Sequence, residues 1–431
     1  MLPVLAAAIV LAGIGVALRL THTAQSNNTS LPIHLAVPQI TLTTSTDVEA
    51  LRASDGKVLW HAPFAHATVI AGSGLVLVAE TGQRLHLLDG RDGKVRWTHT
   101  LSVTAANGQF APALITPDVA LFTANMWQRT DNTYRVQVLA LATSDGHVVW
   151  TYHEDNVMHV DLRLVRDMVM VADHAYVGLV HDISLSALTA TDGSLRWRYS
   201  AHAEHINIYG LAGDTLIIRA AGLTTLNVAT GKQQWQAAAS TFDSAGCIAG
   251  DVIYASVYAS DITMNPYSIA GIAAFRLSDG TILWRHDLSP QRITFPFACT
   301  PDGLLVEQVE SDNGQTMLYH LRGSDGAVLR QSSFAAATVL PIAGLSADVL
   351  LDSATMLTLI DGATGRAHWH FTVPDLAGQF FAYPQSKGGT LYLSRGATAQ
   401  ARATLYAIDA AAGTMRWQHP YDGPINFGLD G

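Results

Sequence analysis

The chain has 431 residues, of which 49% are hydrophobic and 14% are charged. This composition supplies enough apolar surface for an extended core and excludes a disordered polar chain. The formal net charge of -10 comes from scattered acidic residues, and no run of Lys and Arg occurs that would follow a phosphate backbone, so nucleic acid is not expected as a partner.

The N-terminal segment from Leu2 to Leu18 is an unbroken apolar run without a charge. As a helix it would span roughly 25 Å, the short end of a transmembrane helix. No charged region precedes it, and neither a convincing A-x-A cleavage site nor a lipobox cysteine follows it. We therefore predict an uncleaved membrane anchor in residues 1–20, with a cleaved signal peptide as the alternative. Residues 21–30 would form a polar, flexible tether.

The orientation of this anchor depends on one charge. Arg19 follows the apolar run and no Lys or Arg precedes it, which by the positive-inside rule would place the next domain in the cytoplasm. A single charge is a weak determinant of orientation. Against that one charge, we expect a single-pass anchor with the folded domain, residues 31–431, outside the cytoplasm.

An internal repeat dominates the rest of the chain. Nine segments combine an apolar strand, a turn ending in glycine, and a short strand: EALRASDGKVLW, LHLLDGRDGKVRW, LALATSDGHVVW, SALTATDGSLRW, TTLNVATGKQQW, AAFRLSDGTILW, YHLRGSDGAVLR, LTLIDGATGRAHW and LYAIDAAAGTMRW. The turn glycines are Gly56, Gly93, Gly146, Gly193, Gly231, Gly280, Gly326, Gly365 and Gly413. Four residues after each glycine stands Trp60, Trp97, Trp150, Trp197, Trp235, Trp284, Arg330, Trp369 or Trp417.

Each of these signatures predicts a tight β-hairpin. Glycine adopts the left-handed backbone conformation that other residues avoid, and the preceding Asp or Thr hydrogen-bonds the turn. Two more β-rich runs precede each hairpin, which gives four strands per unit. Repeating units of this size are typical of β-propeller blades, and we expect the tryptophans to pack between adjacent blades.

The pattern A-x-D-x-x-T-G-x-x-x-W resembles the tryptophan-docking repeat of the quinoprotein-type (PQQ-like) propellers, with LTLIDGATGRAHW and LYAIDAAAGTMRW among the closest copies. The resemblance covers about residues 45 to 420 and implies an all-β propeller of four-stranded antiparallel blades. Similar chains include PQQ-dependent alcohol and sugar dehydrogenases and a non-enzymatic propeller lipoprotein of the outer-membrane barrel-assembly machinery.

The number of blades is open at this point. Familiar members of the family have eight, so we expect eight blades, with one terminal hairpin outside the ring. Nine would follow if the C-terminal segment PINFGLDG supplied the innermost strand that the first unit lacks.

The loops that join second to third strands, and blade to blade, should lie on the face opposite the nine turns, and they vary most in length: 124–135, 260–271, 310–317 and 394–404. Variable loops on a rigid scaffold often carry function. Trp127, beside Arg129 and Asp131, is the tryptophan outside the signature, and we consider these three residues a candidate ligand or partner contact, with folding back onto the blade as the alternative.

Histidines and carboxylates gather in HEDNVMHVD, which contains His153, Glu154, Asp155, His159 and Asp161. These are metal-ligand residue types, but strand alternation would point several of them apart, and we predict an ordinary polar connection and no metal site. The pairs His202/His205 and His368/His370 lack an evident third ligand.

Cys247 and Cys299 occupy aligned positions at the innermost strands of adjacent blades. They should be near neighbours, but a disulfide requires Cα atoms within about 7 Å. A disulfide and two free buried thiols both remain open.

These observations favour a membrane-anchored, non-catalytic binding or scaffold module for a protein or envelope ligand. No cofactor is expected. The alternatives are a dehydrogenase using PQQ and calcium, as the resemblance implies, or another propeller enzyme, a hydrolase or lyase. Against the first, the adjacent-cysteine ring of those dehydrogenases is missing, and their metal-binding Glu, Asn and Asp find no match.

Overall fold

The computed structural model describes most of the chain after residue 38: residues 39–43, 47–64, 67–80, 84–101, 110–128, 133–157, 159–174, 181–203, 205–237, 244–258, 269–288, 292–300, 302–310, 315–334, 337–342, 348–353, 356–372, 382–395, 402–421 and 427–430. The predicted anchor and tether, residues 1–20 and 21–30, lie outside these ranges. Within them every regular element is a strand, and no helix is present that is long and apolar enough to cross a membrane.

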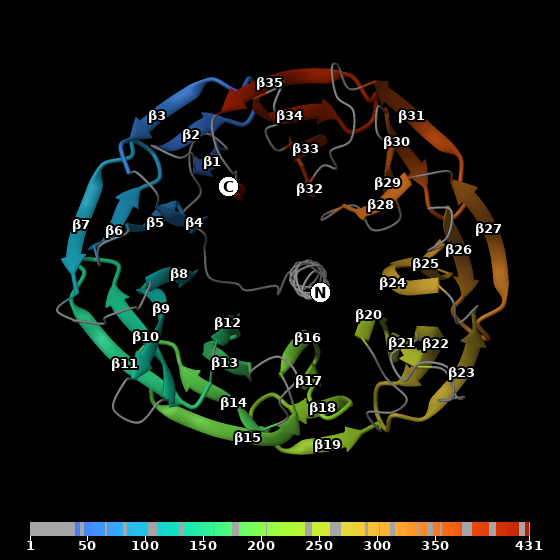
Figure 1. Cartoon of the computed structure of the whole chain (residues 1–431), viewed down its shortest axis with the longest axis horizontal. Coiled ribbons are helices and arrows are strands. Elements are labelled where there is room, and N and C mark those ends of the chain that lie inside the picture. The colour runs from blue at the N-terminus through green and yellow to red at the C-terminus, as the bar shows by residue number, and fades with distance from the viewer. Residues whose placement is uncertain are drawn as a thin grey trace, which may run out of the picture.

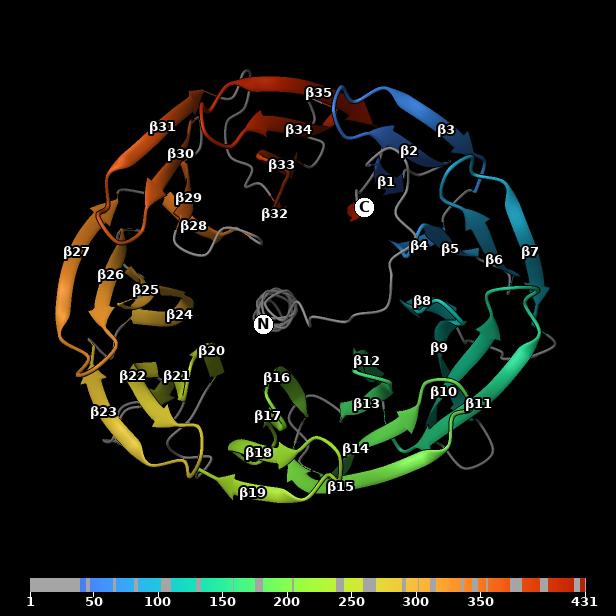
Figure 2. The same cartoon turned by 180° about the vertical axis from the view of Figure 1, so that it is seen from behind.

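The strands form nine four-stranded antiparallel sheets arranged as blades around a ring (Figures 1 and 2). The prediction of a β-propeller is therefore confirmed, and the prediction of eight blades is wrong. Each of the nine signature hairpins forms the third and fourth strands of its own blade, so none stands outside the ring.

The first four blades contain the following strands. Blade 1 has β36 (Phe427–Asp430), β1 (Gln39–Thr43), β2 (Val48–Arg52) and β3 (Val58–Ala62). Blade 2 has β4 (Thr68–Gly72), β5 (Leu75–Glu80), β6 (Arg84–Asp89) and β7 (Val95–Thr100). Blade 3 has β8 (Phe110–Ile115), β9 (Val119–Gln128), β10 (Thr133–Ala142) and β11 (Val148–Asp155). Blade 4 has β12 (His159–Val165), β13 (Met168–His174), β14 (His181–Thr189) and β15 (Leu195–Ala203).

The remaining five blades follow in chain order. Blade 5 has β16 (Asn207–Ala212), β17 (Thr215–Arg219), β18 (Leu223–Asn227) and β19 (Gln233–Gln236). Blade 6 has β20 (Ser244–Ala249), β21 (Val252–Tyr258), β22 (Ile269–Arg276) and β23 (Ile282–Asp287). Blade 7 has β24 (Arg292–Thr300), β25 (Gly303–Glu310), β26 (Thr316–Arg322) and β27 (Val328–Phe334). Blade 8 has β28 (Ala337–Pro341), β29 (Asp348–Ser353), β30 (Met356–Asp361) and β31 (Ala367–Thr372). Blade 9 has β32 (Ala382–Lys387), β33 (Thr390–Arg395), β34 (Ala403–Asp409) and β35 (Met415–Tyr421).

The ring is closed by pairing the two ends of the described chain. Strand β36 is the innermost strand of blade 1 and pairs with β1, so that Asp430 lies opposite Gln39. Gln39 in turn pairs with Arg52, which opens the first signature turn. Both ends therefore lie on the face that carries the nine signature turns, which we call the signature face; the other is the opposite face.

Turn chemistry explains the regular hairpins. Each signature glycine has a positive φ, between 63° and 77°, and its N–H donates to the carbonyl four residues earlier, as from Gly231 to Asn227. Only glycine takes this backbone conformation without strain. A Cβ on Gly231 would also lie 2.4 Å from the ring of Trp197 in the preceding blade, so the turn requires glycine for space as well.

The signature tryptophans join consecutive blades. Each indole N–H donates to a backbone carbonyl three residues before the turn glycine of the next blade: Trp60 to Gly90, Trp97 to Thr143, Trp150 to Ala190, Trp197 to Val228, Trp235 to Leu277, Trp284 to Gly323, Trp369 to Ala410 and Trp417 to Ala53. The apolar clusters also run across blade boundaries, so the core is a chain of junctions.

Candidate functional site

A cluster of titratable side chains lies at the opposite face, between blades 4 and 5. His159 begins β12 and pairs in register with His174, which ends β13. The turn between these strands follows Val165 and lies on the signature face, so the two histidines are at the other end. His205 joins them by a β-bridge to His174 from the chain that leads into blade 5.

Asp161 is the centre of this cluster. Its two carboxylate oxygens lie 3.1 Å from Nε2 of His159 and 3.0 Å from Nε2 of His174. Burial by itself would raise the pKa of Asp161, but the hydrogen bonds with the two imidazoles lower that pKa well below its ordinary value. The carboxylate is therefore ionised at neutral pH, with both oxygens occupied.

His205 and Arg163 flank this carboxylate. The ring of His205 stacks on that of His174 with centroids 6.0 Å apart. Burial, together with the charges of Arg219 and His174, lowers the pKa of His205 to about 4, so His205 is neutral at pH 7. Burial also lowers the pKa of Arg163, which Asp161 partly offsets.

A second polar network lies at the junction of blades 3 and 4. Glu154 of β11 forms an ion pair with Arg198 of β15. Asp173 of β13 is 2% exposed, and one of its oxygens accepts hydrogen bonds from the N–H and hydroxyl of Ser184, both 2.8 Å long. Burial, together with the nearby charge of Glu154, raises the pKa of Asp173 to about 6. This network holds two buried carboxylates against one cation.

The structure separates the residues of the segment HEDNVMHVD. Glu154 belongs to the network between blades 3 and 4, and Asp155 forms an ion pair with Arg135 in its own blade. His159 and Asp161 enter the cluster between blades 4 and 5. In the described ranges, no group of three or more His, Cys, Asp and Glu is arranged to hold a metal ion.

The other predicted histidine pairs are also divided. His202 is exposed and pairs with Asp182, whereas His205 belongs to the cluster. His368 pairs with Asp348, and His370 with the hydroxyl of Thr358.

Trp127 lies in a strand, which corrects its predicted place on a long loop. Strand β9 continues to Gln128, and Trp127 pairs in register with Tyr134 of β10 near the opposite face. Arg129 and Asp131 lie outside the described residues. Whether these three residues contact a ligand stays a prediction.

Sequence reasoning missed His174 and Arg163. Alternation along β12 was a usable signal, because His159, Asp161 and Arg163 are two residues apart and so share one side of the strand. The approach of His174 and His205 depends on how the strands and blades pack, for which the local sequence carries no signal.

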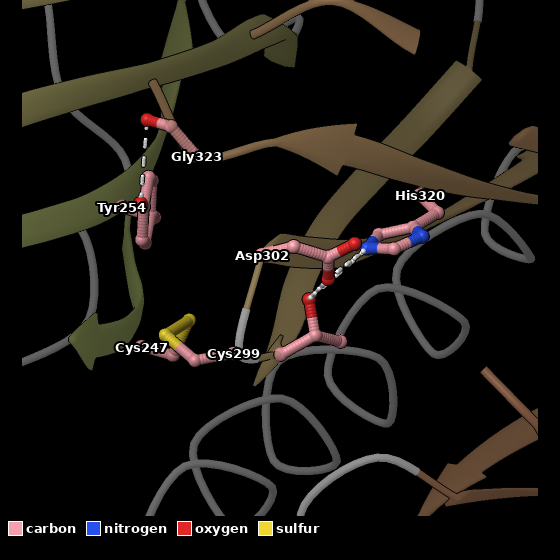
Figure 3. The surroundings of a disulfide bond; sticks show 7 residues. Cys247, Tyr254, Cys299, Asp302, His320 and Gly323 are labelled. Carbon is pink, nitrogen blue, oxygen red and sulfur yellow. Dashed lines mark hydrogen bonds and ion pairs between the residues drawn. A yellow bond between two sulfur atoms is a disulfide. The ribbon is translucent and has the colours of Figure 1, made fainter. Parts of the chain in front are cut away.

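Cys247 and Cys299 form a disulfide between the inner strands of blades 6 and 7, with Cα atoms 5.7 Å apart (Figure 3). Of the two arrangements that the sequence left open, the structure has the bonded one. The same junction holds Tyr254, whose hydroxyl donates to the Gly323 carbonyl that also accepts from Trp284.

Comparison with known proteins bears on the fold. The family model described as "Outer membrane protein assembly factor BamB" matches residues 44–207 and 182–298. No curated protein matches the chain.

Among solved structures, dihydro-heme d1 dehydrogenase NirN in complex with DHE is 13% identical, with a TM-score of 0.53, over 95% of this chain and 80% of that one. BamB from Moraxella catarrhalis is 17% identical, with a TM-score of 0.45, over 74% and 89%. The quinohemoprotein alcohol dehydrogenase ADHIIG from Pseudomonas putida HK5 is 12% identical, with a TM-score of 0.42, over 88% and 68%. At these identities the likeness concerns the fold alone.

Proposed function

This chain belongs to the PQQ-like propeller family of the outer membrane protein assembly factor BamB, and from that membership we propose that it is a non-catalytic module that binds a protein or an envelope ligand. The observation that carries the proposal is the closed ring. Eight tryptophans join the blades into a scaffold, and the cluster of His159, Asp161 and His174 lies at the opposite face, which a partner would meet.

We further propose that the propeller is extracytoplasmic and anchored through residues 1–20. The disulfide between Cys247 and Cys299 supports an oxidising compartment, because such bonds are rare where thiols are kept reduced. The described chain begins at Gln39 on the signature face. An N-terminal anchor would therefore connect to that face and leave the opposite face free to meet a partner.

Thiol labelling tests the proposed compartment. Protein isolated from cells under conditions that trap thiols should incorporate a maleimide at Cys247 and Cys299 after reduction and not before. Labelling of both cysteines without reductant would contradict an extracytoplasmic location.

Site-specific photo-crosslinking in intact cells tests the binding role. A photoreactive residue at position 127, near the opposite face, should form adducts with a specific partner. The matched control places the same residue at Val58, which is exposed and lies two residues after the first turn glycine. Equal adducts from both positions, or none from position 127 and others on the opposite face, would contradict the proposal.

The enzymatic alternative makes a separate prediction. Within the described residues no group of three or more His, Cys, Asp and Glu is placed to hold a metal ion, and we assign no catalytic step. Purified protein incubated with PQQ and Ca²⁺ should not reduce a dye with alcohols or sugars. Dye reduction that requires both additions would replace the binding role with a dehydrogenase.

A further inference from the structure

The outer strand of blade 7 is packed differently from the outer strands of the other blades. No residue of β27 is buried, and its first four residues, Val328 to Gln331, are all exposed. In each other blade the residue at the position of Arg330 is a tryptophan that is buried, or half-buried in β19, and that donates its indole N–H to the next blade. Arg330 packs on Gly365, but its side chain stays exposed. Among the described outer strands, β27 therefore lacks a buried side chain of its own.

β27 is also an edge strand. It comes last in the order β24-β25-β26-β27, and Figure 1 shows it at the outer rim of the ring. Its pairing with β26 is regular from Arg330, opposite His320, to Phe334, opposite Thr316, a stretch that spans roughly 17 Å. Along such an edge, the N–H and C=O groups that point away from the sheet are a template for another strand. The regular edge is long enough for a further strand to pair with it.

Arg330 gives this edge a positive charge without a carboxylate partner. Among the described residues its side chain donates to the hydroxyl of Ser332, at 3.4 Å, and forms no ion pair. By contrast, arginines beside several signature turns are paired with carboxylates: Arg52 with Asp55, Arg91 and Arg96 with Asp89, Arg276 with Asp279, Arg322 with Asp325, and Arg416 with Asp409. The strand itself, VLRQSSF, contains no acidic residue. The charge of Arg330 therefore favours a partner that brings an acidic side chain.

We infer that β27 is a docking edge to which an extended segment of a partner protein adds as a fifth strand of blade 7, with an acidic side chain of that segment paired to Arg330. Backbone hydrogen bonds along the edge supply affinity, and the side chains beside it supply specificity. A guanidinium binds a carboxylate through two parallel hydrogen bonds. Val328 and Leu329, which are 43% and 40% exposed, offer apolar contact next to it. This edge is a second surface of the module, and it rests on the proposed function in that the partner is a protein.

Photo-crosslinking in intact cells tests the edge by comparing Gln331 with Gln418. Both are exposed glutamines five residues after the turn glycine, in β27 and β35, so they occupy equivalent places in blades 7 and 9. A photoreactive residue at position 331 should form adducts with a partner protein, and one at position 418 should not. Arg330→Glu should reduce the adducts from position 331 several-fold. Arg322→Gln is the matched control and should leave them unchanged, because Arg322 is an exposed arginine of the same blade that is paired with Asp325.

The variants separate the parts of the inference. No adducts from position 331, equal adducts from position 418, or adducts that join two copies of this chain would overturn the docking edge. Adducts that persist in Arg330→Glu would overturn the pairing with a carboxylate. The urea midpoint of Arg330→Glu should equal that of the wild type. If that midpoint falls, Arg330→Gln takes its place, because it removes the charge without reversing it, and the same outcomes apply.

Hydrogen exchange tests whether the partner adds as a strand. The partner segment mapped at the photo-adduct is made as a synthetic peptide and added to the purified full-length protein. It should slow amide exchange in β27 and not in β35, and the same peptide with its acidic residues changed to amides should bind several-fold more weakly. Binding without slower exchange in β27 would overturn strand addition.

The two binding surfaces fail independently. Adducts from position 127 without adducts from position 331 would refute this edge and leave the proposed function standing. Adducts from position 331 without adducts from any opposite-face position would support the edge and refute the binding role of the opposite face.

Discussion

Two neighbouring junctions of the ring differ in how they are built. Between blades 6 and 7, Trp284 packs on Gly326 and donates to the Gly323 carbonyl at 2.7 Å, and the Cys247–Cys299 disulfide joins the inner strands. Between blades 7 and 8, Arg330 takes the place of the tryptophan and packs on Gly365. The second junction therefore lacks both the indole and its hydrogen bond.

The blade that carries Arg330 in place of the tryptophan also differs in the adjacent strand. Arg330 pairs in register with His320, whereas Trp284 pairs with Ala274. His320 is 3% exposed, and its Nδ1 donates to the Ala363 carbonyl of blade 8 over 3.3 Å (Figure 3 shows His320 with Asp302). Each junction therefore has an aromatic ring whose N–H donates to the turn of the next blade. The ring comes from the fourth strand of the blade in Trp284 and from the third strand in His320.

The largest expected effect is a difference in the free energy of unfolding between variants at the two kinds of junction. Trp97→Ala removes a buried ring and its hydrogen bond to Thr143, and should lower the free energy of unfolding by about 3–5 kcal/mol. Arg330→Ala removes an exposed side chain and should cost less than about 1 kcal/mol. Urea unfolding of both variants measures the difference. Similar losses would mean that the indole is not the main element of a junction.

Substitution of a turn glycine that packs against a signature tryptophan should give the next largest effect on stability. Gly231→Ala places a side chain against Trp197 in a left-handed backbone conformation, and we expect a loss of about 2–4 kcal/mol. Gly213→Ala is the matched control, because its φ is also positive at 56° but its Cβ would meet nothing within 4 Å. That control should cost about 1 kcal/mol. Equal losses would show that backbone strain, not contact with the ring, makes the turn require glycine.

The stability contributed by the junction of blades 3 and 4, which buries carboxylates, should depend on pH. Asp173 has its pKa raised from 3.8 to about 6, so the folded protein binds a proton that the unfolded chain releases between these values. The wild type therefore loses stability as pH rises from about 4 to 7. Asp173→Asn should remove this loss and stabilise the protein by about 2–3 kcal/mol at pH 8 but not at pH 4. A pH-independent difference between the two proteins would contradict the raised pKa.

The repeated features of this fold are predictable and the singular ones are not. The turn glycines and the tryptophans four residues later follow from local turn chemistry and strand alternation, and the structure places them as expected. The number of blades depends on Gln39 pairing with Asp430 at the far end of the chain. The segment PINFGLDG was a candidate for that strand, but no local pattern fixes the contact, and eight blades were expected because familiar members of the family have eight.

The candidate site shows the same division. Strand alternation places His159 and Asp161 on one side of β12, but their contacts with His174 and His205 arise from strand pairing and from the packing of blade 4 on blade 5. The sequence predicts a loop at Trp127 because segment 124–135 is one of the connections that vary most in length between units, yet β9 and β10 are ten residues long and extend through most of it.

The most direct test of the junction account is to rebuild the missing tryptophan. In a His320→Ala background, which restores the small residue found opposite Trp284, Arg330→Trp should pack on Gly365 and donate to the Gly362 carbonyl. Relative to His320→Ala alone, the added tryptophan should raise the free energy of unfolding by about 1–2 kcal/mol, the part of a buried ring's contribution that an untuned site retains. An unchanged or lower free energy of unfolding would contradict the claim that the indole on the next blade's glycine is what joins the blades.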